Sequence, residues 1–238
     1  MTSPLEQFLI KVLIPLHVFG LDISITNATC FMMIITGCIL FFQWWGLKGP
    51  VIPTRVQSLY EMTYEFIAKI LKENAGREGM RYFPLIFSLF MFILAANILG
   101  MFPYSFTVTS HIAVTFTLAL GLFLVIVFIG FKKHGLKFLT IFYPKGVPLA
   151  VSPLVVPIEI LAFLIRPITL SVRLFANMLA GHIVLKLFAM FTVAMGVWGF
   201  MPFAFVIALT AFEFLIAVLQ AYVFTVLTCI YLHDALHL

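Results

Sequence analysis

The stretch "SVRLFANMLAGH", residues 171–182, is the part of the sequence that best predicts the fold class. It has the composition of a membrane-buried helix, yet it contains Arg173, and a guanidinium stays protonated inside proteins. A charge near the centre of a bilayer costs about 3 kcal/mol on insertion scales. His182, further along the same stretch, can exchange a proton near neutral pH. A permanent charge and a titratable group in one apolar helix therefore indicate a function that uses both.

The composition of the whole chain is that of a membrane protein. Of its 238 residues, 63% are hydrophobic and 10% are charged, and the mean hydropathy is +1.18. This predicts a single polytopic membrane domain over residues 1–238. The net charge of +5 does not indicate a nucleic-acid partner, because Lys and Arg also set the orientation of membrane proteins. The three cysteines have no disulfide or metal-ligand spacing: Cys30, Cys38 and Cys229.

The N-terminal residues "MTSPLEQFLIKVLIPL" have neither a signal-peptide cleavage pattern nor an Arg-rich transit composition. We therefore expect either a protein of the bacterial inner membrane or one made inside the organelle in which it works.

Three segments have the length and composition of simple transmembrane helices, at about 20 residues each. The first, 25–45, ends in two tryptophans suited to the headgroup region. No Asp, Glu, Lys or Arg occurs between Tyr82 and Phe131, where the motif "GMFPYSFTVTSH" separates two further spans at 83–102 and 111–131.

Residues 54–75 alternate apolar and charged side chains at helical spacing, which predicts an amphipathic helix on the membrane surface. The same pattern also fits a solvated helix packed on another subunit. Lys and Arg gather in 46–81 and 132–150, and the loop 101–110 has none. The positive-inside rule then places both basic segments in the cytoplasm or matrix and the N-terminus outside.

The last part of the chain contains two apolar segments, 151–195 and 203–234, that are longer than a bilayer requires. The turn signal "MGVWGFMPF" joins them, so we expect a long, strongly tilted two-helix hairpin. The predicted fold class is therefore an all-α polytopic membrane protein with three transmembrane helices, one amphipathic surface helix and this hairpin.

The polar residues of the hairpin fall into pairs. If the turn is centred near Val197, residues equally far from it lie at the same height. Three polar pairs meet this condition: Arg173 with Gln220, His182 with Glu213, and Glu159 with Asp234. Unrelated polar residues, each satisfied separately, are the alternative. The outer pair lies about 13 Å along the helix from Arg173, toward the turn.

This layout predicts two proton-accessible half-paths with a barrier between them. Imidazole and carboxyl groups can pass a proton on, whereas Arg173 repels an excess proton and cannot release its own. Such a barrier is useful when a mobile carboxyl group carries the proton past it. This chain has no acid at the height of Arg173 that could do so, so we expect the carrier on another, moving subunit.

Three segments resemble a known family: "PITLSVRLFANMLAGH" (167–182), "LQAYVFTVLTCIYLHDALH" (219–237) and "PLIFSLFMFILAANILGMFPYSFTVTSHIAVTF" (84–116). They look like the a subunit, the proton-channel stator subunit, of rotary F-type ATP synthases. Because His is on the first arm and the acid on the second, the chain resembles the mitochondrial and alpha-proteobacterial members.

The resemblance implies a role for each hairpin residue. Arg173 matches the essential stator charge, with Asn177 and Gln220 as its polar neighbours. His182 and Glu213 match the outer half-channel, and Glu159 matches an inner acid, beside which our pairing puts Asp234. Arg166 occupies a position that is often basic, and Lys186 is expected to snorkel to the outer surface.

The resemblance also implies the partners and the location. These are the c-ring against the 151–234 hairpin, a peripheral-stalk b-type subunit, other membrane subunits and lipid, in an energy-coupling inner membrane. No cofactor or metal is implied. The chain lacks a phosphate-binding loop, so we expect a non-catalytic subunit. No oxygen-ligand cage for a cation is evident in the sequence, so we expect it to translocate protons rather than sodium. The alternatives are a stand-alone ion-coupled secondary transporter, for which no internal repeat is evident, and a membrane-arm subunit of a respiratory enzyme.

Overall fold

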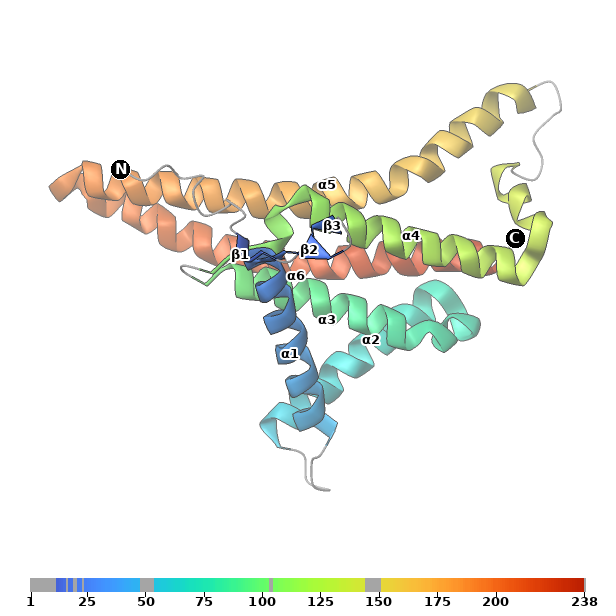
Figure 1. Cartoon of the computed structure of the whole chain (residues 1–238), viewed down its shortest axis with the longest axis horizontal. Coiled ribbons are helices and arrows are strands. Elements are labelled where there is room, and N and C mark those ends of the chain that lie inside the picture. The colour runs from blue at the N-terminus through green and yellow to red at the C-terminus, as the bar shows by residue number, and fades with distance from the viewer. Residues whose placement is uncertain are drawn as a thin grey trace.

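The computed structural model describes residues 12–15, 17–18, 21–22, 24–47, 54–102, 105–143 and 151–237. Within these ranges the chain is almost entirely helical (Figure 1). Its long helices are α1 (Asn27–Leu47), α2 (Arg55–Gly79), α3 (Phe83–Gly100), α4 (Ile112–His134), α5 (Ser152–Ala194) and α6 (Phe200–Leu236). Short 3₁₀ helices lie between them: η2 (Met80–Tyr82), η3 (Val108–Ser110), η4 (Gly135–Phe142) and η5 (Gly196–Gly199).

Four short strands precede α1. The all-α prediction did not include these strands. β1 (Val12–Ile14) pairs antiparallel with β4 (Ile25–Thr26), and β2 (His17–Val18) pairs antiparallel with β3 (Leu21–Asp22). Val, Ile and Thr in these segments are β-branched and favour extended backbone. The prediction that no signal peptide is present concerns the first residues of the chain, most of which lie outside the described residues.

Five helical segments of the described chain are long and apolar enough to cross a membrane: Asn27–Leu47, Arg55–Gly100, Ile112–Phe142, Ser152–Ala194 and Phe200–Leu236. The second segment, Arg55–Gly100, contains α2, η2 and α3. Within it, Gly76 has a φ of 69°, a left-handed conformation that breaks the regular turns of α2 just after Ala75. The N-terminal end of α2 is capped by Thr54, whose hydroxyl accepts a hydrogen bond from the Gln57 amide.

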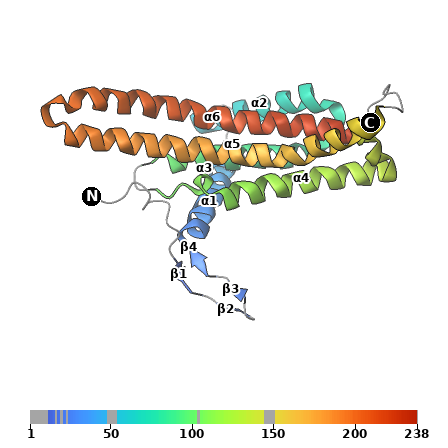
Figure 2. The ribbon, with the colours of Figure 1, turned by 90° about the horizontal axis from the view of Figure 1, so that it is seen from above.

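α5 and α6 form a long antiparallel hairpin that runs the length of the molecule (Figures 1 and 2). At its turn, Gly196 has a φ of 54°, and a Cβ on Gly199 would lie 2.2 Å from the Thr192 carbonyl oxygen. Neither position tolerates a larger residue without strain, so these glycines allow the tight fold-back that the sequence predicts.

α6 is the central helix of the molecule, because it contacts α2, α3, α4 and α5. Its buried face carries many small side chains, among them Ala217, Ala221, Thr225 and Cys229. Small residues let helices approach closely in membrane proteins, where van der Waals packing drives association. This close packing sets the positions of the polar side chains on the hairpin.

The first part of α5 leaves α6 and bends away from it (Figure 1, yellow). Pro157 and Pro167 lie inside this helix. A proline lacks the amide hydrogen for the helical bond, and its ring clashes with the preceding turn, so it bends a helix. The two arms of the hairpin are therefore close near the turn and separated at the open end.

Candidate functional site

The outer pair of the hairpin is close in space, as the sequence predicts. His182 Nδ1 lies 3.7 Å from Glu213 Oε1. On the other side of the ring, His182 Nε2 lies 3.1 Å from Thr107 Oγ1, and this hydroxyl donates to the Gly100 carbonyl oxygen. A hydroxyl has one hydrogen to give, so Thr107 accepts from Nε2–H. Nδ1 is therefore the ring nitrogen that faces Glu213, an arrangement suited to passing a proton between the two groups.

Glu213 is deeply buried, with 5% of its surface exposed. Neither of its carboxylate oxygens accepts a hydrogen bond from a described residue. The side chain lies against the backbone of α5 at Gly181, where an added Cβ would be 2.6 Å from Oε1. Gly181 therefore makes the space in which the carboxyl group reaches His182.

Further polar groups on the neighbouring helices contact the hairpin. Asn97 on α3 is fully buried and donates to the Ala217 carbonyl oxygen of α6 at 3.2 Å. Thr115 on α4 and Ser171 on α5 share a hydrogen bond of 3.2 Å. Thr107 lies with the buried Thr109 and Ser110 at η3. These groups extend the polar region from the hairpin into α3, η3 and α4.

These groups on α3, η3 and α4 were not predicted from the sequence, because only the polar residues of the hairpin were paired. Two signals were present in the sequence. The run "TVTSH" (107–111) is polar inside an otherwise apolar segment, and Asn97 is an amide within an expected span. Polar residues in membrane helices are costly to bury and therefore point to functional positions.

Arg173 is exposed on the free face of α5. Val172, next to it in the chain, is exposed as well. No carboxylate of the described residues lies within ion-pair distance of the guanidinium. The charge is therefore presented on an exposed face of α5, where an anion from outside this chain could reach it.

Gln220 does not contact Arg173 in the way that we expected. Its side-chain oxygen accepts a hydrogen bond of 3.1 Å from Asn177 Nδ2, one turn further along α5. Gln220 is buried, with 4% of its surface exposed. Its partner on α5 is thus four residues nearer the turn than equal spacing predicts, so the register of the two arms shifts with distance from Gly196.

The inner pairing is also different from the expected one. Asp234 accepts a hydrogen bond of 3.1 Å from Arg166, and forms an ion pair with it, instead of lying beside Glu159. The Arg166 guanidinium also lies over the Tyr231 ring, 4.7 Å from its centre. Glu159 is half-buried on α5, two turns before Arg166, on the part of the helix that bends away from α6.

The remaining candidates occupy ordinary positions. Lys186 is half-buried on α5, one turn beyond His182 toward the fold-back. The cysteines at 30, 38 and 229 are free thiols. In the ranges that the structure describes, no three His, Cys, Asp or Glu side chains are grouped closely enough to hold a metal ion.

Fold and site together define an integral membrane protein whose long helical hairpin holds a titratable pair and an exposed arginine at different positions along its length. Residues 29–233 match the family model described as ATP synthase A chain. The chain is 56% identical to ATP synthase subunit a of Parvibaculum lavamentivorans, with 99% of this chain and 94% of the relative covered. It is 51% identical to that of Rhodospirillum rubrum over the full length of both, and 54% identical to that of Rhizobium etli, covering 99% and 97%.

The chain belongs to the ATP synthase A chain family, as its resemblance to the a subunit predicted. The comparisons therefore do not favour a stand-alone transporter. These relatives come from alpha-proteobacteria, in agreement with an inner-membrane location and with the several apolar helices.

Proposed function

We propose that this chain conducts protons through two offset half-channels and couples their flow to ATP synthesis through a rotating ring of c subunits. The observation that carries the proposal is the separation of two groups on one hairpin. The His182–Glu213 pair, of which Glu213 is buried, lies toward the turn, and Arg173 lies about 13 Å further along α5 on an exposed face.

The outer half-channel leads through η3 to the titratable pair. Buried polar atoms without a partner among the described residues occur along this route, on Asn97, Thr109, His111 and Glu213. Buried polar groups normally bond to protein or to ordered water, so these atoms mark a hydrated path. A proton would pass along it to His182, whose Nδ1 hands it to Glu213 and then to the ring.

Arg173 is the barrier between the two paths. Its charge attracts an ionised ring carboxylate and repels an excess proton, and the guanidinium does not deprotonate. A ring carboxyl group must therefore take up a proton on one side before it moves into lipid, and must release it after a nearly full rotation on the other side.

The inner half-channel begins at the open end of the hairpin, where α5 and α6 diverge. Glu159 is the acid of this path, and the Arg166–Asp234 ion pair shapes its mouth. In the membrane, α1, α3 and α4 are the simple spans, α2 lies on the surface and α5–α6 form the tilted hairpin. The chain is non-catalytic and uses no cofactor, and its partners include the ring, a peripheral-stalk b-type subunit and other membrane subunits.

Substitution of Arg173 tests this proposal. We expect Arg173→Ala and Arg173→Lys both to abolish ATP-driven proton pumping by the reconstituted complex, because an ammonium group can lose its proton when buried and lacks the planar fork. Arg55→Ala, which removes an exposed cation from α2, is the matched control and should pump normally. Near wild-type pumping by Arg173→Lys would show that the barrier works differently.

A further inference from the structure

A basic pocket of about 740 Å³ lies where the end of α2, the start of α3 and the C-terminal ends of α4 and α6 meet. Four cations line it: Arg77, Arg81, Lys132 and Lys133. The single carboxylate in its lining is Glu78. This pocket is distant from the hairpin turn and takes no part in the proton paths described above.

One of these cations has a structural role. Lys133 donates to the Glu78 carboxylate and, at 2.9 Å, to the Leu236 carbonyl oxygen. His134 lies 3.1 Å from the same carbonyl oxygen. These bonds tie the ends of α2, α4 and α6 together and form a fixed floor for the pocket.

The other three cations are available to a ligand. Arg77, Arg81 and Lys132 are exposed, and none of them has a carboxylate partner in the described part of the chain. Three positive charges that line one pocket repel each other, and a bound anion would offset this repulsion. Phosphate groups suit such a site, since Arg forks bind them with two hydrogen bonds and Lys adds a point charge.

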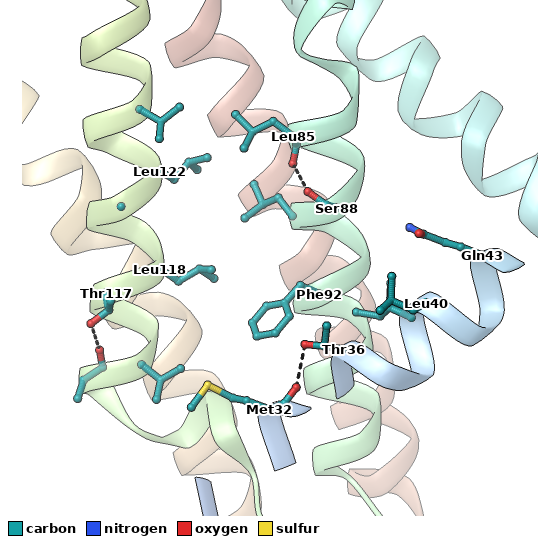
Figure 3. Close-up of a pocket in the computed structure, with 16 residues that line it drawn as sticks. Met32, Thr36, Leu40, Gln43, Leu85, Ser88, Phe92, Thr117, Leu118 and Leu122 are labelled. Atoms are coloured by element: carbon teal, nitrogen blue, oxygen red, sulfur yellow. Dashed lines mark hydrogen bonds between the residues drawn. The ribbon is translucent and has the colours of Figure 1, made fainter. Parts of the chain in front are cut away.

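An apolar groove of about 880 Å³ lies between α1, α3 and α4 (Figure 3). Leu85 and Val125 line both this groove and the basic pocket, so the two spaces are adjacent. Gly121 leaves one wall of the groove open, because a Cβ there would meet no atom within 4 Å. A ligand anchored at the basic pocket can therefore extend along the groove.

The groove suits hydrocarbon more than a polar occupant. Its hydroxyl groups on Thr36, Ser88 and Thr117 each donate to a carbonyl oxygen of their own helix, as the dashed lines in Figure 3 show. They have no hydrogen left to give to an occupant. Its other walls are mainly aliphatic, such as Leu118 and Leu122.

We propose that this pocket and groove bind one anionic phospholipid. Its phosphate lies among Arg77, Arg81 and Lys132, and an acyl chain passes Leu85 and Val125 into the groove. Basic pockets between membrane helices attract anionic headgroups, and a phospholipid joins that charge to hydrocarbon in the order that the two spaces present. A transmembrane helix of a partner could fill the groove, but it would leave the three cations without an anion.

Photo-crosslinking in the intact complex tests the lipid. A benzoylphenylalanine replaces Phe128, which lines the pocket and is 67% exposed, so the probe fits without repacking a core. The complex is reconstituted in phosphatidylcholine bilayers with or without phosphatidylglycerol. We expect an adduct with phosphatidylglycerol in preference to phosphatidylcholine, and no competition from millimolar inorganic phosphate.

Charge variants show whether the three cations bind the headgroup. Replacing Arg77, Arg81 and Lys132 with Gln should lower the phosphatidylglycerol adduct by about tenfold or more. The matched control replaces Lys69, Lys72 and Lys137, which are exposed outside the pocket, with Gln and should retain the adduct. Any one of four results would overturn the proposal. These are an equal loss of adduct in both variants, equal labelling of the two lipids, displacement of the lipid by phosphate, and an adduct with a polypeptide.

Discussion

Gly181 gives a sharp test of the outer pair, because it can be changed without removing any titratable group. A Cβ at this position would lie 2.6 Å from Glu213 Oε1 and 3.0 Å from Cδ. Ordinary contacts begin at 3.4 Å, so Gly181→Ala must push the carboxyl oxygen back by about 0.8 Å. The same oxygen faces His182 Nδ1 at 3.7 Å, so the change moves the proton-exchanging atom directly.

The expected effect is on proton flow and not on folding. Misplacing a reacting group by 1 Å can cost up to about 10²-fold in rate, and we expect proton-driven ATP synthesis to fall roughly tenfold. Alanine in a helix is more favourable than glycine by about 1 kcal/mol, and the Glu213 carboxyl group is the flexible end of its side chain. The complex should therefore assemble normally.

Gly37→Ala is the matched control for this variant. Gly37 lies inside α1, and a Cβ there would meet no atom within 4 Å. It gains the same helix propensity without touching the outer pair, so synthesis should stay at the wild-type rate. Rates are measured in inverted vesicles under an imposed proton gradient, normalised to the assembled complex. Equal rates for the two alanine variants would refute the argument that the position of Glu213 limits proton entry.

Three further outcomes follow from the hairpin and its neighbours. Exchanging His182 and Glu213 should restore more proton flow than either single exchange, whereas a purely additive result would contradict their coupling. In a double-mutant cycle with alanine, Arg166 and Asp234 should couple by less than about 1 kcal/mol in thermal unfolding, because their side chains are 24% and 35% exposed. Asn97→Leu should lower the unfolding midpoint of the complex by an amount that corresponds to about 1 kcal/mol, and an unchanged midpoint would show that its bond to α6 contributes nothing.

How much of the site could be predicted depends on distance from the turn. His182 and Glu213 are close to Gly196, and equal spacing from the turn was enough to pair them correctly. Glu159 is more than thirty residues away from it, beyond Pro167, and Asp234 is paired with Arg166. A pairing rule assumes parallel axes, whereas the angle between two helices depends on packing that a single sequence does not reveal.

The groups on other helices were hidden for a different reason. Asn97 lies on α3 and Thr107 at η3, and periodicity shows neither that α3 packs on α6 nor that η3 faces α5. Hydropathy predicts that a segment is helical and apolar, but it does not determine which neighbours that helix will have. The short strands before α1 were missed because each spans only two or three residues, too few to show an alternating pattern.

Two acids of the hairpin, Asp234 and Glu213, differ in whether local structure explains their position. Asp234 is paired with Arg166, and such a bond can be explained by local structure alone. Glu213 is more deeply buried, yet its oxygens accept no hydrogen bond from the described residues. A buried carboxylate without full pairing costs several kcal/mol, and an apolar side chain of similar volume would pack at least as well. Stability therefore does not account for Glu213, and the space that Gly181 leaves beside it brings its carboxyl oxygen to the His182 ring. That arrangement is consistent with a group that must gain and lose a proton, because strong fixed bonds to either charge state would hold it in that state.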